Sequence, residues 1–212
     1  MSKREFSQWL ISHRSDTVAG NNNEYSNQAK VVAIASGKGG VGKTTLALQM
    51  AQQLSKAGNK VLLIDCDYNL SNTAVKLGLP LNDNFFSLLS MEKGFSDCVH
   101  KMENLHLLTG CNGNSDLYDK SFEHDRFIID IISEHGHEYD YIMLDCPAGM
   151  NRETVNLTAY ADFRLMVVNP DASSITDTYA LIKILKQRHA ININHLVVNK
   201  VQTKSQYHKV VN

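Results

Sequence analysis

The chain has 212 residues, of which 43% are hydrophobic and 20% charged, and its formal net charge at pH 7 is −1. This length and composition predict one sizeable α/β domain with an apolar core and short tails. Because the chain is nearly neutral, we expect no nucleic-acid partner. No apolar run approaches the ~20 residues that cross a bilayer, and residues 1–6 lack the apolar stretch of a signal peptide, so we expect a cytoplasmic protein.

Residues 1–29 differ from the rest of the chain. A polar, loop-like stretch at 20–23 follows a possible short amphipathic helix. The apolar face of that helix consists of Phe6, Trp9, Leu10 and His13. We interpret residues 1–29 as an N-terminal tail, which either docks on its own domain or binds a partner, and assign residues 30–212 to a single domain.

From residue 30 onward, short apolar runs alternate with helical patterns. The apolar runs predict six buried strands, at residues 31–35, 61–64, 105–108, 141–144, 165–168 and 196–198. Helices are predicted at residues 46–54, 127–132 and 175–185, the last with Ser173 or Ser174 as its N-cap. Strands that are apolar throughout are buried on both faces, so the pattern predicts a mostly parallel sheet with helices on both faces. Ligands bind beyond the carboxyl ends of the strands in such sheets.

A glycine-rich loop follows the first predicted strand and reads Gly-Lys-Gly-Gly-Val-Gly-Lys-Thr-Thr at residues 37–45. It matches the phosphate-binding pattern G-x-x-x-x-G-K-[ST] in its expected place between a strand and a helix. Glycines let the backbone approach phosphates closely, and the N–H groups of the loop and the helix N-terminus form an anion cradle. The predicted nucleotide-binding residues are Gly37, Gly39, Gly40, Val41, Gly42, Lys43, Thr44 and Thr45. Lys43 would reach the β- and γ-phosphates, Thr44 would place its hydroxyl on Mg²⁺, and Thr45 would bond the α-phosphate.

Lys38, beside the first glycine, has no role in the plain motif. With this lysine the loop resembles the deviant Walker A motif of the MinD/ParA family of ATPases. The resemblance covers residues 30–201 and implies a SIMIBI-like P-loop NTPase fold, ATP and Mg²⁺ as cofactors, and an ATPase that is weak without its partner. It also implies that Lys38 acts with Lys43 in catalysis, by reaching the partner's nucleotide in an ATP-sandwiched homodimer. A cation supplied in this way can accelerate phosphoryl transfer ~10³–10⁵-fold.

Acidic residues follow two of the predicted strands. Asp65 and Asp67 lie at i and i+2 after the second strand, so in an extended chain they point the same way and can share one site. The resemblance implies that Asp67 positions the attacking water and that Asp65 joins the Mg²⁺ shell. The alternative is that one of them only caps the following helix. Asp145 ends the fourth strand like a Walker B residue and would bind Mg²⁺ through water, and residues 147–149 resemble the family's second switch.

Asn199 follows the sixth predicted strand. In the family that the loop resembles, an asparagine at this place binds the edge of adenine, because an amide offers both a donor and an acceptor. The alternative is an asparagine that only forms a turn.

Residues 168–183 read Val-Asn-Pro-Asp-Ala-Ser-Ser-Ile-Thr-Asp-Thr-Tyr-Ala-Leu-Ile-Lys. This segment resembles the FlhG branch, the MinD-like ATPases that control flagellar number and placement. The resemblance implies an ATP-dependent dimerising switch that converts ATP and water to ADP and phosphate. Its partners would be a second copy, flagellar assembly proteins and an FlhF-like GTPase.

The chain departs from that branch at both ends. The N-terminal pattern D-Q-A-x-x-L-R, which engages the GTPase in the branch, has no good match in residues 1–29. The family's basic, amphipathic, membrane-binding C-terminal helix is not evident before Asn212, which leaves membrane contact in doubt for this chain. A form with that helix would lie at the inner membrane or the cell pole.

Two other functions stay open. A ParA-like DNA-partitioning ATPase would need a basic face, for which the overall charge gives no support. A nucleotide-dependent iron–sulfur carrier ATPase, like the nitrogenase iron protein, would use Cys111 and Cys146 at a dimer interface. However, the four cysteines contain no C-x-x-C pair and read as reduced cytosolic thiols.

Overall fold

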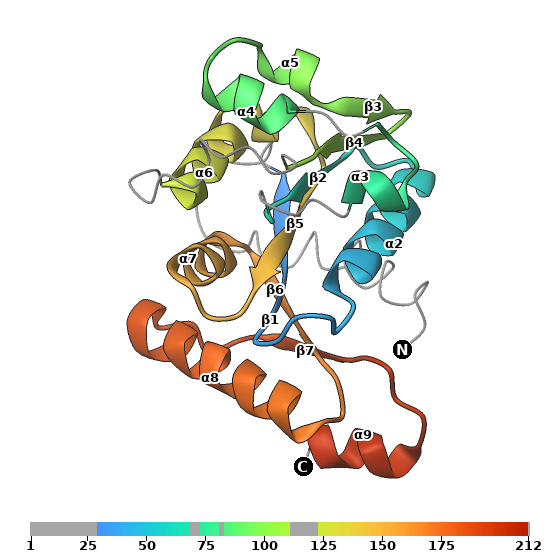
Figure 1. The fold of residues 1–212 in the computed structure, drawn as a ribbon, viewed down its shortest axis with the longest axis vertical. Helices are drawn as coiled ribbons and strands as arrows, with labels where there is room; N and C mark the ends of the chain where they lie inside the picture. The colour runs from blue at the N-terminus through green and yellow to red at the C-terminus, as the bar shows by residue number, and fades with distance from the viewer. Residues whose placement is uncertain (1–28, 68–72, 81–82, 111–122, 212) are drawn as a thin grey trace, which may run out of the picture.

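The computed structural model describes residues 29–67, 73–80, 83–110 and 123–211. They form a seven-stranded sheet in the order β3-β4-β2-β5-β1-β6-β7 (Figure 1). The strands are β1 Lys30–Ser36, β2 Val61–Asp65, β3 His100–Met102, β4 Leu105–Leu108, β5 Tyr141–Ala148, β6 Phe163–Val168 and β7 His195–Val198. The neighbouring strands are parallel except for β3 and β4, which are antiparallel. The predicted fold class is therefore confirmed.

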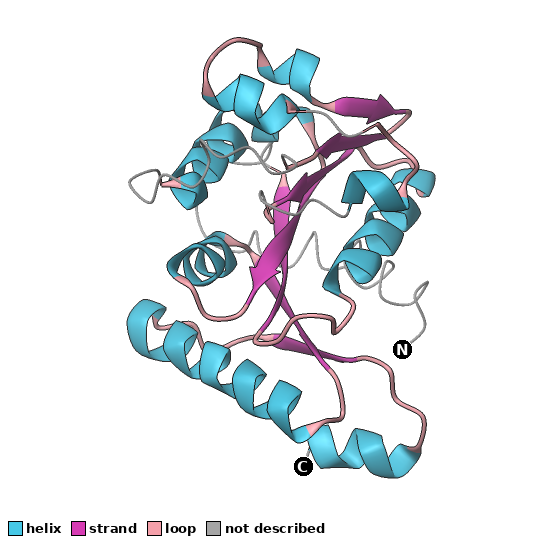
Figure 2. Ribbon diagram, in the orientation of Figure 1, coloured by secondary structure: helices cyan, strands magenta, loops and turns pink. Residues whose placement is uncertain are grey.

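Helices cover both faces of the sheet (Figure 2). They are α2 Lys43–Lys56, α3 Thr73–Lys76, α4 Asn84–Leu89, α5 Phe95–Cys98, α6 His124–His135, α7 Arg152–Tyr160, α8 Ala172–His189 and α9 Lys204–Val211, with a 3-10 turn, η2, at Gly136–Glu138. The two faces follow from the alternation along each strand, because neighbouring residues point to opposite sides. On β1, Val32 and Ile34 pack in the core under α2, while Ala33 and Ala35 pack in the core under α6, α7 and α8.

The cap of α8 differs from the sequence prediction. Asp171 is the N-cap, and its Oδ1 accepts a hydrogen bond of 2.9 Å from the backbone N–H of Ser174. Ser174 is instead buried in the first turn, where its hydroxyl accepts from the backbone N–H of Asn169 at 3.0 Å. The prediction of Ser173 or Ser174 was therefore wrong. Asp171, Ser173 and Ser174 are all residue types that suit an N-cap. Asp171 is the one that has the extended backbone of an N-cap.

The C-terminal segment contains a helix that the sequence analysis did not single out. The helix α9 has eight residues, and none of them is buried. None of the helices in the described ranges has the length and apolar character needed to cross a membrane. The predicted N-terminal helical face, at Phe6 to His13, lies outside the described residues.

Candidate functional site

The motifs predicted from sequence converge at the carboxyl ends of the three central strands. The glycine-rich loop continues directly from β1 and leads into α2, while Asp65 ends β2. Asp145 is the register partner of Asp65 on the adjacent strand β5. These segments meet at one edge of the sheet, because parallel strands bring their carboxyl ends together.

The loop of residues 37–45 uses its glycines in two ways. Gly40 and Gly42 have φ values of 73° and 106°, in the region that favours glycine, and Gly42 is the N-cap of α2. Gly37 is needed for packing, since a Cβ at this position would lie 2.2 Å from the backbone carbon of Asp177 in α8. Val41 anchors the loop, because its side chain is buried in the core under α2.

Two residues after β7 hold the same loop from the other side. The side-chain amide of Asn199 donates to the carbonyl oxygen of Val41 at 2.7 Å. The ammonium of Lys200 donates to the carbonyl oxygen of Gly40 at 2.8 Å. The backbone of Lys200, which follows Asn199, has a φ of 55°, in the left-handed region that favours glycine. Backbone strain at a non-glycine residue often marks a functional constraint.

Asp65 and Asp67 lie in different environments. Asp65 is buried, and its carboxylate accepts from the Thr73 hydroxyl at 2.5 Å, the Thr73 N–H at 3.3 Å and the Asp67 N–H at 3.1 Å. Asp65 thus holds Thr73, the first residue of α3, in place. Asp67 is exposed, and its negative charge raises the pKa of Lys43, although less than burial lowers it.

Lys43 and Asp145 form the buried part of the site, and Thr44 beside them is half-buried. Burial lowers the pKa of Lys43, and the charge of Asp145 opposes that shift. Burial, and next the charge of Asp65, raises the pKa of Asp145 to about 7, while a hydrogen bond with the Thr44 side chain acts in the other direction. The Oδ1 atom of Asp145 is buried without a hydrogen-bond partner among the described residues.

This arrangement fits a magnesium–phosphate ligand. A buried oxygen without a partner is costly, and a cation with its shell of water would satisfy Asp145. The Thr44 hydroxyl and the Asp65 carboxylate supply further oxygen atoms of the kind that Mg²⁺ prefers. The described residues contain no group of three or more His, Cys, Asp or Glu side chains that could hold a metal ion.

Lys38 lies at the outer side of the loop. Its ammonium forms an ion pair with Asp171, with 3.1 Å between Nζ and Oδ1. The loop is further shaped by the Ser36 hydroxyl, which donates to the Lys38 carbonyl oxygen at 2.7 Å. In a single chain the lysine that is expected to act across a dimer therefore lies against its own α8.

Sequence reasoning missed four residues that the structure brings to the site: Thr73, Lys76, Asp171 and Lys200. Asp171 and Lys200 follow predicted strands, so their place beyond a carboxyl strand end could have marked them. Nothing in the local pattern marks Thr73 or Lys76, because both belong to a four-residue helix too short to show a period.

The three cysteines in the described ranges do not form a surface site for a shared cluster. Cys146 is buried, and the Thr158 hydroxyl in α7 lies 4.0 Å from its sulfur. Burial raises the pKa of this thiol to about 12, which disfavours the thiolate that metals bind. Cys66 and Cys98 are also buried free thiols, and Cys111 lies outside the described residues.

The chain and its fold match known proteins. The AAA domain family (AAA_31) matches residues 29–198. An uncharacterized ATP-binding protein of Methanocaldococcus jannaschii is 36% identical over 71% of this chain and 57% of its own length. The flagellum site-determining protein YlxH of Helicobacter pylori is 35% identical over 73% of this chain and 53% of its own length.

Among solved structures, the septum site-determining protein MinD of Pyrococcus horikoshii, complexed with Mg-ADP, has a TM-score of 0.67 and 27% identity. That match covers 79% of this chain and 68% of the MinD chain. The chain thus spans little more than half the length of the two curated relatives. The family match extends over most of the chain and contains the glycine-rich loop, Asp65 and Asp145. The chain belongs to the AAA domain (AAA_31) family, the MinD/ParA-type P-loop ATPases.

Proposed function

We propose that this chain is an ATP-dependent dimerising switch that binds ATP with Mg²⁺ at residues 37–45 and hydrolyses it to ADP and phosphate. One observation carries the proposal. The Lys43 ammonium and the Asp145 carboxylate are both buried at the N-terminus of α2, where Asp145 Oδ1 has no hydrogen-bond partner among the described residues. A triphosphate with its cation would satisfy both side chains.

Each residue of the site then has a role. The loop N–H groups bind the phosphates, Lys43 neutralises charge on the β- and γ-phosphates, and Thr44, Asp65 and Asp145 hold Mg²⁺ directly or through water. The cation would stabilise the negative charge that develops during phosphoryl transfer. Asp67 is exposed at the end of β2, where a water can approach it, and it orients this water toward the γ-phosphate. Asn199 supports the loop and binds adenine.

The dimer depends on Lys38. Its ion pair with Asp171 is between two partly exposed side chains, and such pairs contribute little to stability. Lys38 can therefore leave Asp171 when a second copy presents a nucleotide. A lysine that exchanges an internal carboxylate for the partner's phosphates makes dimerisation depend on ATP.

The first experiment measures the molar mass of the protein by multi-angle light scattering, with Mg²⁺ and either ADP or a non-hydrolysable ATP analogue. We expect a monomer with ADP and a dimer with the analogue. Lys38→Ala should abolish the dimer and retain nucleotide binding by the monomer, whereas Lys183→Ala, an exposed lysine of α8, should behave as the wild type. Dimers of Lys38→Ala that persist unchanged would refute the role of Lys38.

The second experiment separates hydrolysis from dimerisation. Asp67→Ala should bind ATP and dimerise with ATP itself, but release phosphate at least tenfold more slowly, because the attacking water loses its orienting carboxylate. Phosphate release at the wild-type rate would contradict the role assigned to Asp67.

The proposed biological role is control of flagellar number and placement, through flagellar assembly proteins and an FlhF-like GTPase as partners. It is supported by the FlhG-like segment 168–183 and by the similarity to YlxH. Placement of the division septum is the second candidate, and the similarity to MinD favours it. Cells that lack the gene should have altered flagellar number with normal septa. Misplaced septa with normal flagella would favour the septum role.

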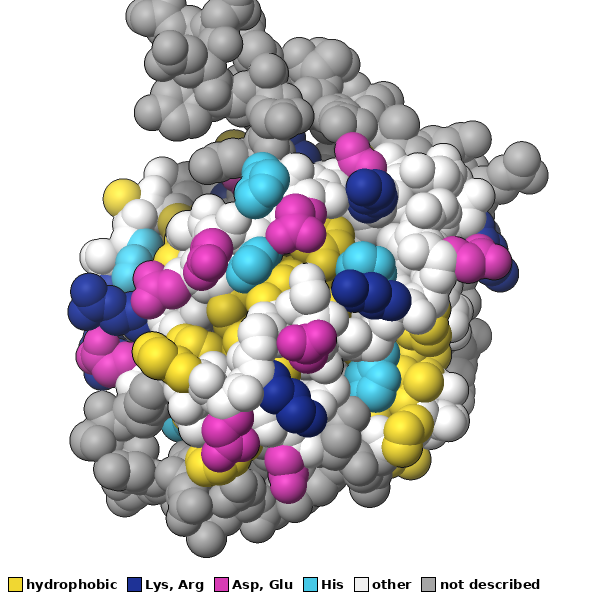
Figure 3. Space-filling model, turned by 90° about the horizontal axis from the view of Figure 1, so that it is seen from above, with side chains coloured by type: hydrophobic (Ala, Val, Ile, Leu, Met, Phe, Trp, Pro, Cys, Tyr) yellow, Lys and Arg dark blue, Asp and Glu magenta, His cyan; other side chains and the backbone are white. Residues whose placement is uncertain are grey.

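A DNA-partitioning role receives less support. On the face seen in Figure 3, Lys and Arg side chains are interspersed with Asp and Glu, and they form no continuous basic surface there. An ATP-dependent gel shift of DNA that is weaker at the higher of two salt concentrations would instead support DNA binding.

A further inference from the structure

We propose that Lys76, on α3, is an additional nucleotide-binding residue that contacts the α-phosphate. This inference rests on the proposed function and adds to it a residue outside the glycine-rich loop and both acidic segments.

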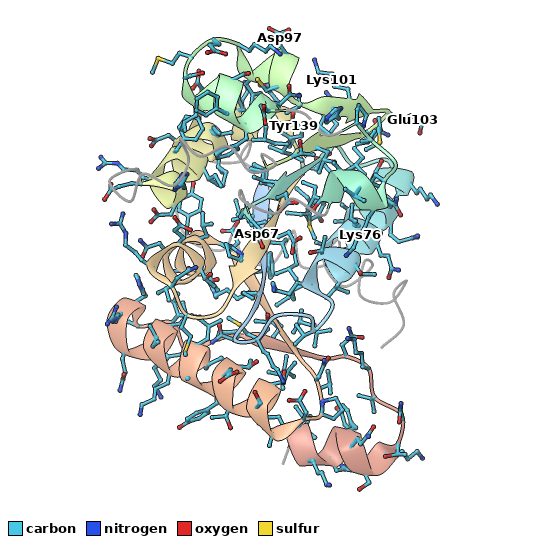
Figure 4. All side chains as sticks on the ribbon, viewed as in Figure 1. Asp67, Lys76, Asp97, Lys101, Glu103 and Tyr139 are labelled. Atoms are coloured by element: carbon cyan, nitrogen blue, oxygen red, sulfur yellow. The ribbon has the colours of Figure 1, made fainter. Side chains whose placement is uncertain are left out.

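The position of Lys76 is defined by a contact with the loop. Its ammonium donates a hydrogen bond to the Thr45 hydroxyl, with 3.2 Å between Nζ and Oγ1. Thr45 lies in the first turn of α2 and is exposed, and it is the residue expected to bond the α-phosphate. Figure 4 labels Lys76 on α3 and Asp67 after β2. An α-phosphate bound at Thr45 would thus lie within reach of the Lys76 ammonium.

The electrostatics at this point favour an anion. The N-terminus of α2 carries a partial positive charge, and its first turn contains no acidic residue and no side-chain cap. A lysine beside a helix N-terminus is unfavourable unless a negative group lies between them. Within the described residues, the ammonium of Lys76 is bonded to a neutral hydroxyl.

A second observation points to a ligand at the same place. The buried Asp145 Oδ1 has no hydrogen-bond partner among the described residues. Lys43 begins α2, and Lys76 donates to the hydroxyl of Thr45 two positions further along, so both lysines belong to the first turn of this helix or contact it. With Mg²⁺ on the carboxylate, the two ammonium groups are left to bind phosphate.

The backbone that carries Lys76 is held in place at both ends. At the start of α3, Thr73 is buried and its hydroxyl donates to Asp65 at 2.5 Å. Just after α3, Leu77 and Leu79 pack against the core under α2. A solvated surface lysine would not need such support, and this anchoring lowers the entropic cost of holding the ammonium at the phosphate.

Contact of Lys76 with the α-phosphate has a specific consequence for selectivity between nucleotides. ATP, ADP and AMP all carry this group, so Lys76 should strengthen the binding of all three equally. Lys38 and Lys43 act on the outer phosphates and should separate the three nucleotides. Lys76 therefore contributes affinity and leaves the choice between ATP and ADP unchanged.

The test measures dissociation constants of the full chain for ATP, ADP, AMP and adenosine, by isothermal titration calorimetry and by competition with a fluorescent ADP analogue. Lys76→Ala should weaken the three nucleotides by about tenfold, the order expected for a charge-assisted hydrogen bond. Adenosine should bind as it does to the wild type. Lys76→Arg should recover most of the affinity, and Lys56→Ala, at the far end of α2, should change nothing.

The outcomes distinguish this inference from the proposed function. A wild-type chain that binds no nucleotide would overturn the proposed function. If the wild type binds nucleotides, equal dissociation constants for Lys76→Ala would overturn the role of Lys76. A loss confined to ATP, or an equal loss for adenosine, would overturn the α-phosphate assignment. Circular dichroism shows whether each variant is folded, and Lys76→Gln, which keeps most of the stem, replaces the alanine variant if that one unfolds.

Discussion

Lys38 and Asp171 are separated by 133 positions in the sequence, yet 3.1 Å separates the ammonium nitrogen from a carboxylate oxygen. Asp171 has two tasks, because the same Oδ1 atom also caps α8 through the N–H of Ser174. Both contacts lower the pKa of Asp171, the backbone hydrogen bond more than the lysine, and the residue stays ionised at neutral pH. The pair joins the loop that would bind nucleotide to the helix that follows β6.

Asp171→Asn should make ATP-dependent dimerisation easier. Asparagine is as good an N-cap as aspartate, so α8 keeps its cap while Lys38 loses its charged partner. Because exposed ion pairs are weak, we expect the dimer dissociation constant to fall only about two- to fivefold, as measured by sedimentation velocity with a non-hydrolysable ATP analogue. Asp171→Ala is the matched control, since it also removes the cap and should lower the melting temperature by a few degrees. An unchanged dissociation constant for Asp171→Asn would show that the pair does not restrain Lys38.

Gly37→Ala should destabilise the fold as well as the site. The added Cβ would lie 2.2 Å from the Asp177 backbone carbon and 2.6 Å from the Thr178 backbone nitrogen, so α8 would have to move. Overpacking of this kind costs about 1–3 kcal/mol, which urea denaturation would detect. Gly39→Ala is the matched control, because its Cβ would meet only the Ala148 Cβ at 3.9 Å, and its unfolding free energy should stay near that of the wild type. Similar losses in both variants would argue against packing as the cause.

Asn199→Ala should weaken the binding of ligands that contain no base. The Asn199 amide holds the carbonyl oxygen of Val41, so its loss should loosen the phosphate cradle. We expect the affinities for ATP and for inorganic tripolyphosphate to fall together, by about fivefold, the effect of one neutral hydrogen bond. Lys200→Met should act in the same direction, because it removes the bond to Gly40. If Asn199 contacts only adenine, tripolyphosphate will bind the Asn199→Ala variant with wild-type affinity.

His106 should make stability depend on pH. Its Nδ1 lies 2.9 Å from the Tyr139 hydroxyl, and burial, then the charge of Lys101 and also that of Lys60, lowers its pKa from 6.5, although Glu138 opposes them. Lys101 and Tyr139 are labelled in Figure 4. A lowered pKa means that the unfolded chain binds the proton more readily, so this contribution to stability is present above pH 6.5 and is lost as the pH falls through the folded-state value.

The measurement is the free energy of unfolding of wild type and His106→Gln from pH 7.5 to 5. Glutamine keeps a hydrogen-bonding group but does not titrate, so the wild type should lose more stability than the variant across this range. Parallel curves for the two proteins would contradict a lowered pKa of His106.

The strands were predictable because burial on both faces leaves a local signal. All six apolar runs are strands in the structure. The strand β4 has its predicted range, and the other five differ from theirs only at the ends. The strand β3 was missed, because His100–Met102 has three residues and none of them is buried. The short helices α3, α4 and α5 were missed for a similar reason, since four to six residues give no clear helical period.

The site was predictable where its residues are contiguous. A glycine-rich loop between a strand and a helix specifies a phosphate cradle by itself, since its backbone N–H groups and the helix N-terminus are local features. Asp65 and Asp145 were each predicted to follow an apolar run, and the structure makes them register partners because β2 and β5 are adjacent and parallel. The sequence did not indicate that Asp65 is buried while Asp67 is exposed, because this contrast depends on the contact between Thr73 and Asp65.

The sequence by itself determined the parallel α/β fold and the loop at residues 37–45, because apolar runs and glycine spacing act through local backbone geometry and burial. Only the tertiary structure decided which distant side chains reach that loop. Asp171 binds Lys38, Asn199 binds Val41 and Lys76 binds Thr45 across 133, 158 and 31 positions, respectively. These contacts depend on strand order and helix packing, which bring carboxyl strand ends together after the chain has crossed the sheet several times.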